Sequence, residues 1–262
     1  MQDDRTSLDD ALALMRDLRT RCEWDAAQTH QSLRPYLIEE ALEVDDAIRA
    51  ENDTLLREEL GDLLLQVLFH SVVAEDRGAF TFHDVAHGFI AKMKQRHPHL
   101  YGEGERVPWE QGKAKKRASI VDGLPVDLPA LHRAFRLQDR AAGVGFDWPD
   151  VEGPMEKVAE ELEEVRGELR ESPPPADPHH APRYDRAHDR LESELGDLLF
   201  SVVNLCRKAG VHPGNALDRA NVKFARRFQA IERLAAERGI DVRSAGLAAL
   251  DALWDEVKLD GG

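Results

Sequence analysis

Cysteine is almost missing from this 262-residue sequence, which contains only Cys22 and Cys206. Two thiols so far apart supply neither a disulfide framework nor the paired spacing of a zinc knuckle, so we expect both to be buried and reduced. Long apolar runs are missing too, because no stretch reaches the roughly 18 apolar residues that cross a membrane. The N-terminus starts acidic, without the basic and apolar segments of a signal peptide. These absences favour a cytoplasmic protein.

Positive charge is also scarce. The chain has 35 Lys and Arg residues against 50 Asp and Glu, for a formal net charge of -15 and a pI near 5.2. Extended contact with a nucleic acid backbone or with anionic lipid depends on Lys and Arg. We therefore expect neither nucleic acid nor membrane as a partner, whereas a small anionic ligand carried with a divalent cation suits this charge.

Patterns typical of strands are nearly absent, and apolar residues recur at helical spacing. Leu8, Leu12 and Met15, for example, fall on one stripe. The Pro-rich residues 172–180 cannot continue a helix and are expected to form a solvated loop between two helices. The chain length suits two domains. We predict an all-α protein with an N-terminal domain at 1–122 and a C-terminal domain at 123–262, divided near Gly123.

The sequence contains an internal repeat. Residues 59–64, ELGDLL, recur letter for letter as residues 194–199. Upstream, EEALE at 39–43 parallels EELEE at 160–164, and downstream KMKQR at 92–96 parallels KFARR at 223–227. Because the parts follow the same order in both halves, the sequence indicates a tandem duplication.

Each copy carries two pairs of acidic residues spaced three apart, which places both members of a pair on one helix face. Two such helices side by side would bring four carboxylates together, and a cation would be needed to offset their repulsion. Ligands that are all oxygen favour Mg²⁺, with Mn²⁺ as a substitute. The acids are Glu161, Glu164, Glu194 and Asp197 in the second copy, and Glu40, Glu43, Glu59 and Asp62 in the first.

The competing interpretation of such acids is a solvated helix face. A solvated face would usually offer basic partners one turn away, whereas Glu194 and Asp197 bracket a run of Leu and Phe without an interleaved Lys or Arg. Gly196, between the two acids, costs about 1 kcal/mol relative to Ala in a helix interior, which predicts that another helix approaches closely. The apolar residues expected to hold this helix by packing are Leu195, Leu198, Leu199, Val202 and Val203.

Other helical metal sites and common catalytic motifs can be set aside. A di-iron or di-manganese bundle requires Glu-x-x-His on two helices, and this spacing does not occur in the sequence. A GxxxxGK[ST] phosphate loop, a GxSxG elbow and an HExxH pair are also absent from the sequence.

Amide and basic residues follow the second acid pair, and the copies differ among them. Lys and Arg suit the phosphate oxygens of a triphosphate bound with Mg²⁺, although a solvated basic face is the simpler explanation for Arg226. Where the second copy has Asn204 and Asn221, the first has Phe69 and Ile90, so polar groups are lost from its inward face. We predict that the second copy is catalytic and the first mainly structural or weakly active. The set comprises Asn204, Asn221, Lys223, Arg226 and Arg227.

Taken together, these motifs resemble the MazG-type nucleoside triphosphate pyrophosphohydrolases in their two-domain form. The resemblance covers essentially the whole chain and includes CEWD at 22–25, RHPH at 96–99, VGFDW at 144–148 and ANVKFARRF at 220–228. It implies an all-α fold, an intertwined homodimer, Mg²⁺ dependence, and cleavage between the α and β phosphates. The sequence departs from the family pattern in two places. The spacer before Arg190 is long and Pro-rich, and CEWD stands in place of the family's Cys-Pro-Trp-Asp.

The resemblance also implies roles for individual residues. Glu161, Glu164, Glu194 and Asp197 correspond to the metal ligands. Trp254 corresponds to the aromatic residue near the base, with a plain core position as the alternative. The remaining nucleotide-contacting positions are Lys157, Glu160, Arg190, Lys223 and Arg227.

The resulting hypothesis is hydrolysis of nucleoside or deoxynucleoside triphosphates to a monophosphate and pyrophosphate, in the service of nucleotide-pool house-cleaning. Glu160 or Glu161 would orient the attacking water, and two metal ions would suit so many acids. Two alternatives stay open. One is a narrower all-α pyrophosphatase acting on dUTP, dCTP or phosphoribosyl-ATP. The other is a non-catalytic nucleotide-sensing scaffold.

Overall fold

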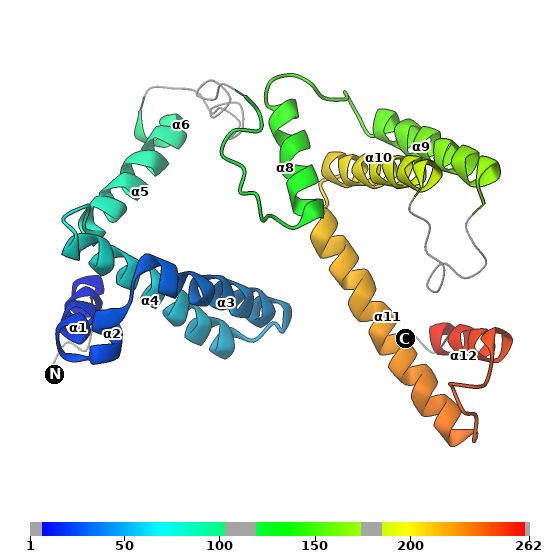
Figure 1. Ribbon diagram of the computed structural model, residues 1–262, viewed down its shortest axis with the longest axis horizontal. Coiled ribbons are helices and arrows are strands. Elements are labelled where there is room, and N and C mark those ends of the chain that lie inside the picture. The colour runs from blue at the N-terminus through cyan, green and yellow to red at the C-terminus, as the bar shows by residue number, and fades with distance from the viewer. Residues whose placement is uncertain (1–6, 103–118, 174–184, 260–262) are drawn as a thin grey trace. The chain divides into compact units, whose positions relative to one another are not determined.

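A computed structural model describes residues 7–102, 119–173 and 185–259. Within these ranges every regular element is a helix, which confirms the all-α prediction (Figure 1). The chain divides into two compact units, Met1–Val107 and Pro108–Gly262. The predicted boundary near Gly123 falls inside the second unit, because Arg140 donates hydrogen bonds of 2.8 Å to the carbonyl oxygens of Ile120 and Asp122.

The first unit is a set of helices started by polar caps. Ser7, Thr29 and Thr81 each form a capping box with the residue three positions on, which satisfies backbone N–H groups at a helix start. A short turn with Glu51 at φ 51° reverses the chain, so the third helix packs along the fourth. The helices are α1 (Leu8–Arg21), α2 (Glu23–Ala27), α3 (His30–Arg49), α4 (Asp53–Asp76), α5 (Phe82–Arg96) and α6 (Pro98–Tyr101).

The core of the first unit lies where α1 and α3 meet the C-terminal half of α4. The middle of the predicted α1 stripe is buried, whereas Leu8 is 52% exposed at its start. Burying such side chains contributes about 1.5–3 kcal/mol each, so this cluster fixes α1 across α4. Its buried members are Leu12, Met15, Leu33, Leu68, Phe69, Val72 and Val73.

The second unit repeats the helix pair and extends it. Helix α9 packs along α10, α8 contacts α10, and α11 leads away from this pair (Figure 1). Helix α12 packs on α11 through Ile231, Ala235, Leu253 and Val257. The helices are α8 (Ala130–Ala142), α9 (Glu152–Glu171), α10 (Arg186–Lys208), α11 (Pro213–Glu237) and α12 (Leu247–Leu259). The predicted loop at 172–180 begins where α9 ends, and its residues 174–180 lie outside the described residues.

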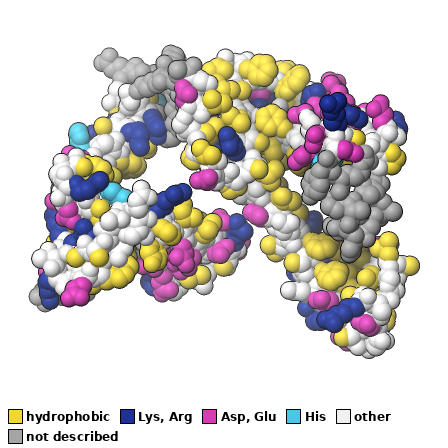
Figure 2. Space-filling model, in the orientation of Figure 1, with side chains coloured by type: hydrophobic (Ala, Val, Ile, Leu, Met, Phe, Trp, Pro, Cys, Tyr) yellow, Lys and Arg dark blue, Asp and Glu magenta, His cyan; other side chains and the backbone are white. Residues whose placement is uncertain are grey.

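Three expectations about packing are wrong. Cys22 and Cys206 are free, as expected, but only half-buried. Of the apolar residues expected to hold α10, Val203 is buried but Leu199 is 58% exposed, and Leu195 and Val202 are exposed too. A Cβ on Gly196 would meet nothing within 4 Å, so no described helix approaches closely there. The reason is that α8 and α9 cover only part of the circumference of α10, so the rest of its apolar face stays exposed in the single chain. Figure 2 shows hydrophobic side chains exposed over α8 and α10.

None of the described helices combines the length and the apolar character needed to span a membrane.

Candidate active site

Helices α9 and α10 bring the predicted acids of the second copy together. One carboxylate oxygen each from Glu161, Glu194 and Asp197 lies within 4.8 Å of the others. Glu164 lies beside them. Burial, then the nearby charges of Glu161 and Glu194, raise the pKa of the Glu164 carboxyl. Two acid pairs separated by some 30 residues in sequence therefore meet because α9 lies along α10. Four clustered oxygen donors of this kind suit a hard divalent cation.

Lys157 closes one side of this cluster. Its Nζ lies 3.0 Å from Glu160 Oε1 and 2.6 Å from Glu161 Oε1, and hydrogen bonds to Glu161 and Glu160 raise the pKa of the Lys157 amine. Glu161 is only 4% exposed, and a buried carboxylate needs such a partner. One cation from α9 thus holds two neighbouring carboxylates in place.

The first unit gathers its acids in the same way. Oxygens of Glu40, Glu43 and Glu59 lie within 4.8 Å of one another. Burial and then the Asp62 charge raise the pKa of Glu40, and burial, Glu43 and Asp62 raise the pKa of Glu59. All four predicted acids of this copy therefore lie together. Figure 2 shows the carboxylates gathered over α3 and α4, and again over α9 and α10.

The lysine distinguishes the two clusters, and the sequence analysis missed this difference. In the register of the two EE motifs, Tyr36 stands where the second copy has Lys157. The Tyr36 ring instead lies 6.5 Å from Trp24 in an edge-on contact. The signal is in the sequence, because Tyr36 and Lys157 each stand four residues before the first acid of their cluster, Glu40 and Glu161. Among the described residues, only the second cluster has this lysine contact.

The other predicted nucleotide-contacting residues form separate groups. Arg190 Nε donates to Glu168 Oε2 at 2.9 Å, one turn beyond Glu164 on α9. The Trp254 ring contacts Phe224 at 5.4 Å, with Arg227 stacked at 5.8 Å. Lys223 and Asn221 are exposed on α11. Helix α12, which carries Trp254, lies away from α9 and α10 (Figure 1). The single chain therefore does not bring Trp254 to the acids.

The first copy was expected to carry inward-facing apolar residues, Phe69 and Ile90, in place of Asn204 and Asn221. This is confirmed for Phe69 and wrong for Ile90. Phe69 is 2% exposed, as an inward residue should be, but Ile90 is 49% exposed. Asn204 is half-buried, and its Oδ1 accepts hydrogen bonds from Arg207 Nε at 3.1 Å and Nη2 at 2.8 Å. Arg207 also pairs with Asp147, and its hydrogen bond lowers the pKa of that carboxyl. Asn221 and Ile90 are thus surface residues of this chain.

One known sequence family matches both halves of the chain. The sequence profile described as the MazG nucleotide pyrophosphohydrolase domain matches residues 28–101 and 151–231. Each match includes one acid cluster. The chain belongs to the MazG family. The two matches also confirm the predicted tandem duplication.

Several relatives align with the MazG chain along most of its length. A Thermotoga maritima protein named nucleoside triphosphate pyrophosphohydrolase/pyrophosphatase MazG is 42% identical over 95% of both chains. An Escherichia coli K12 protein named nucleoside triphosphate pyrophosphohydrolase is 40% identical over 93% of both. The Bacillus subtilis uncharacterized protein YabN is 42% identical over 94% of this chain but 50% of its own length.

Proposed function

We propose that this MazG protein hydrolyses nucleoside or deoxynucleoside triphosphates between the α and β phosphates, releasing a monophosphate and pyrophosphate, in its second unit. The observation that carries the proposal is the cluster of Glu161, Glu164, Glu194 and Asp197 with Lys157 against it. The names of the Thermotoga and Escherichia relatives support the same activity. A role in clearing unwanted nucleotides from the pool would follow from such an activity.

The site residues have distinct parts in this proposal. The four acids would hold Mg²⁺, with Mn²⁺ as a substitute, and the bound ion would lower the pKa of a water and offset phosphate charge. Lys157 keeps Glu161 aligned within the cluster. Glu160 is exposed beside it, so Glu160 or Glu161 is placed to orient a water for in-line attack on the α phosphorus.

We also propose that the working form is an intertwined homodimer. The α10 face around Gly196, with Leu195 and Leu199, is apolar and exposed, and a second copy would cover it. The partner would also bring its α11 and α12, with Lys223 and Trp254, toward the acids. Analytical ultracentrifugation should show a dimer. Mixing inactive Glu161→Gln with inactive Trp254→Ala protein should restore activity if one site uses both chains.

The decisive experiment incubates the protein with Mg²⁺ and a panel of nucleoside triphosphates. It measures whether pyrophosphate or orthophosphate is released. Glu161→Gln and Asp197→Asn should abolish pyrophosphate release. The matched substitutions in the first unit, Glu40→Gln and Asp62→Asn, should leave most of it. Chelation of the metal should stop the reaction in the unsubstituted protein.

Three results would change the proposal. Unchanged turnover in Glu161→Gln and Asp197→Asn would remove the second unit as the active site. Turnover confined to dUTP, dCTP or phosphoribosyl-ATP would replace the broad activity with the narrower one. Nucleotide binding without any release would favour the sensing scaffold, for which the first unit, with Tyr36 in place of the lysine, is the better candidate.

A further inference from the structure

Lys157 brings a positive charge into the acid cluster of the second unit. Its Nζ lies 2.6 Å from Glu161 Oε1 and 3.0 Å from Glu160 Oε1. Its charge also reaches Glu164, where it opposes the rise in pKa that burial and the neighbouring acids cause. The ammonium group therefore offsets part of the repulsion among these carboxylates before any divalent cation binds.

The two members of the closer ion pair differ in exposure. The Glu161 side chain is 5% exposed, whereas that of Lys157 is 39% exposed. A buried carboxylate that loses its partner destabilises a protein strongly, because its charge stays in a poorly solvated place. The ammonium group sits on a flexible four-carbon stem and can reach solvent or another anion while α9 keeps its place. Lys157 is thus the member of the pair that can move.

A divalent cation at the cluster competes with this lysine. Oxygens of Glu161, Glu194 and Asp197 lie within 4.8 Å of one another, so Glu161 belongs both to the ion pair and to the candidate metal site. A cation among these oxygens would lie close to the ammonium group, and like charges at short range repel. Metal binding by the protein alone therefore has to work against Lys157.

A triphosphate removes this conflict. Its oxygens carry negative charge, and a lysine ammonium group binds phosphate as a point charge. Lys157 precedes Glu161 by one helical turn on α9, so its side chain can turn from the carboxylate to a phosphate without movement of the helix. The nucleotide would then draw the lysine away from Glu161, and the released carboxylate would be available to the cation.

The first unit shows that the acids can assemble without a lysine at this position. Tyr36 stands there, and its ring contacts Trp24. Burial and neighbouring carboxylates raise the pKa of Glu40 and of Glu59, yet the fold still gathers them. Assembly of the cluster alone is therefore not sufficient to account for Lys157.

We propose that Lys157 couples metal binding to triphosphate binding in the second unit. Its ammonium group pairs with Glu161 in the free protein and moves to a phosphate oxygen when nucleotide and metal bind together. This inference rests on the proposed function, in which Lys157 aligns Glu161, and adds that the contact breaks during binding. Metal alone then binds weakly, and each ligand strengthens the binding of the other.

Lys157→Gln tests the coupling, because it removes the charge and keeps a polar side chain. Parent and variant both carry Glu40→Gln and Asp62→Asn, so that the first cluster does not contribute. Isothermal titration calorimetry measures the affinity for Mn²⁺ alone, and the affinity for α,β-methylene-ATP in excess Mg²⁺. The methylene group of this analogue prevents cleavage at the proposed bond.

The two affinities should change in opposite directions. Mn²⁺ should bind Lys157→Gln at least about threefold more tightly than the parent, because the competing charge is gone. The analogue should bind at least about tenfold more weakly, because a charged contact to phosphate is lost. A fall in both affinities would mean that Lys157 only aligns Glu161. An unchanged Mn²⁺ affinity would mean that it only contacts nucleotide, and either result overturns the proposal.

Arg166→Gln is the matched control on the same helix. It removes an ion pair with Glu163, whose side chain is 59% exposed, and both affinities should stay at the parent values. A gain in Mn²⁺ affinity equal to that of Lys157→Gln would reveal a general charge effect and overturn the proposal. Lys157→Arg keeps the charge and should keep the weak Mn²⁺ binding. If the Gln variant does not fold, tighter Mn²⁺ binding by the Arg variant would contradict the coupling.

Thermal unfolding adds a measurement that needs no nucleotide. Without metal, Lys157→Gln should unfold at a lower temperature than the parent, since Glu161 loses its partner. Saturating Mn²⁺ should raise that temperature more than it does in the parent, and a smaller rise would refute the competition. None of these measurements requires turnover. A protein that releases no pyrophosphate would therefore refute the proposed function, while the affinities would still decide the role of Lys157.

Discussion

Gly153, in the first turn of α9, should be a position where alanine destabilises a helix. A Cβ there would lie 2.4 Å from Trp148 Cε3 and 2.7 Å from Cδ2. Ordinary carbon contacts are about 3.5–4.0 Å, so the indole ring must retreat by roughly 1 Å. Overpacking of this kind costs about 1–3 kcal/mol. Because Trp148 is 44% exposed and can move partly into solvent, we expect the lower part of that range.

Gly167 provides the matched control in the same helix. A Cβ there would meet nothing within 4 Å, and Ala is favoured over Gly in a helix interior by about 1 kcal/mol. At Gly153 the same propensity gain offsets part of the overpacking cost, so Gly153→Ala should lower the unfolding temperature by no more than roughly 4 °C, whereas Gly167→Ala should raise it by roughly 2–4 °C.

Differential scanning calorimetry of metal-free protein measures both glycine variants, and tryptophan fluorescence reports on movement of the ring. The contact argument is refuted if both variants are stabilised equally, since propensity alone would then decide the outcome.

Three further predictions concern stability. Hydrogen bonding by Arg207 lowers the pKa of Asp147, so urea unfolding should show Asp147→Asn weaker than the parent at pH 7, with the difference disappearing as pH falls through the lowered pKa. Burial, then the charges of His212 and Arg136, lower the pKa of His132 from its usual 6.5. The free energy of unfolding should therefore fall as the pH drops below about 6.5, because the unfolded chain takes up the proton first. Thermal unfolding at pH 8 and at pH 5.5 should show a smaller fall for His132→Phe than for the parent protein. Ile231→Ala, at a side chain 1% exposed, should lose about 2–5 kcal/mol in chemical denaturation; a loss below 1 kcal/mol would contradict its place in the α11–α12 core.

The acid clusters could be predicted because their geometry is local. A spacing of three residues places two carboxylates on one helix face whatever the tertiary context, and the duplication indicated that two such helices belong together. Glu161 and Glu194 accordingly meet. The class of the fold followed from helical periodicity for the same reason.

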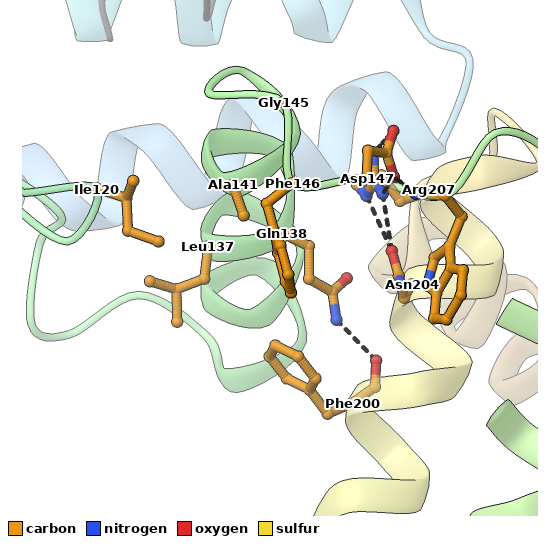
Figure 3. A pocket seen from close by; sticks show the side chains of 11 residues that line it. Ile120, Leu137, Gln138, Ala141, Gly145, Phe146, Asp147, Phe200, Asn204 and Arg207 are labelled. Atoms are coloured by element: carbon orange, nitrogen blue, oxygen red, sulfur yellow. Dashed lines mark hydrogen bonds and ion pairs between the residues drawn. The ribbon is translucent and has the colours of Figure 1, made fainter. Parts of the chain in front are cut away.

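The features that sequence analysis missed depend on contacts between distant segments. A cavity of about 550 Å³ between α8 and α10 (Figure 3) depends on how these helices lie against each other. Gln138 of α8 meets the Phe200 carbonyl of α10 across 62 residues of sequence. The prediction for Gly196 was wrong because the cost of a helical glycine does not reveal what lies next to it. Its surroundings in this chain are open, so no contact within the single chain explains the glycine.

The two copies show how a duplicated site can diverge without losing its acids. Two positions distinguish them: Tyr36 against Lys157, and Phe69 against Asn204. In the first unit both residues are aromatic and contact Trp24, so they add to packing. In the second unit the lysine contacts the acid cluster, and the asparagine lines the cavity between α8 and α10. The aromatic pair therefore adds to packing in the first unit, whereas the polar pair keeps an ammonium and an amide group in the second.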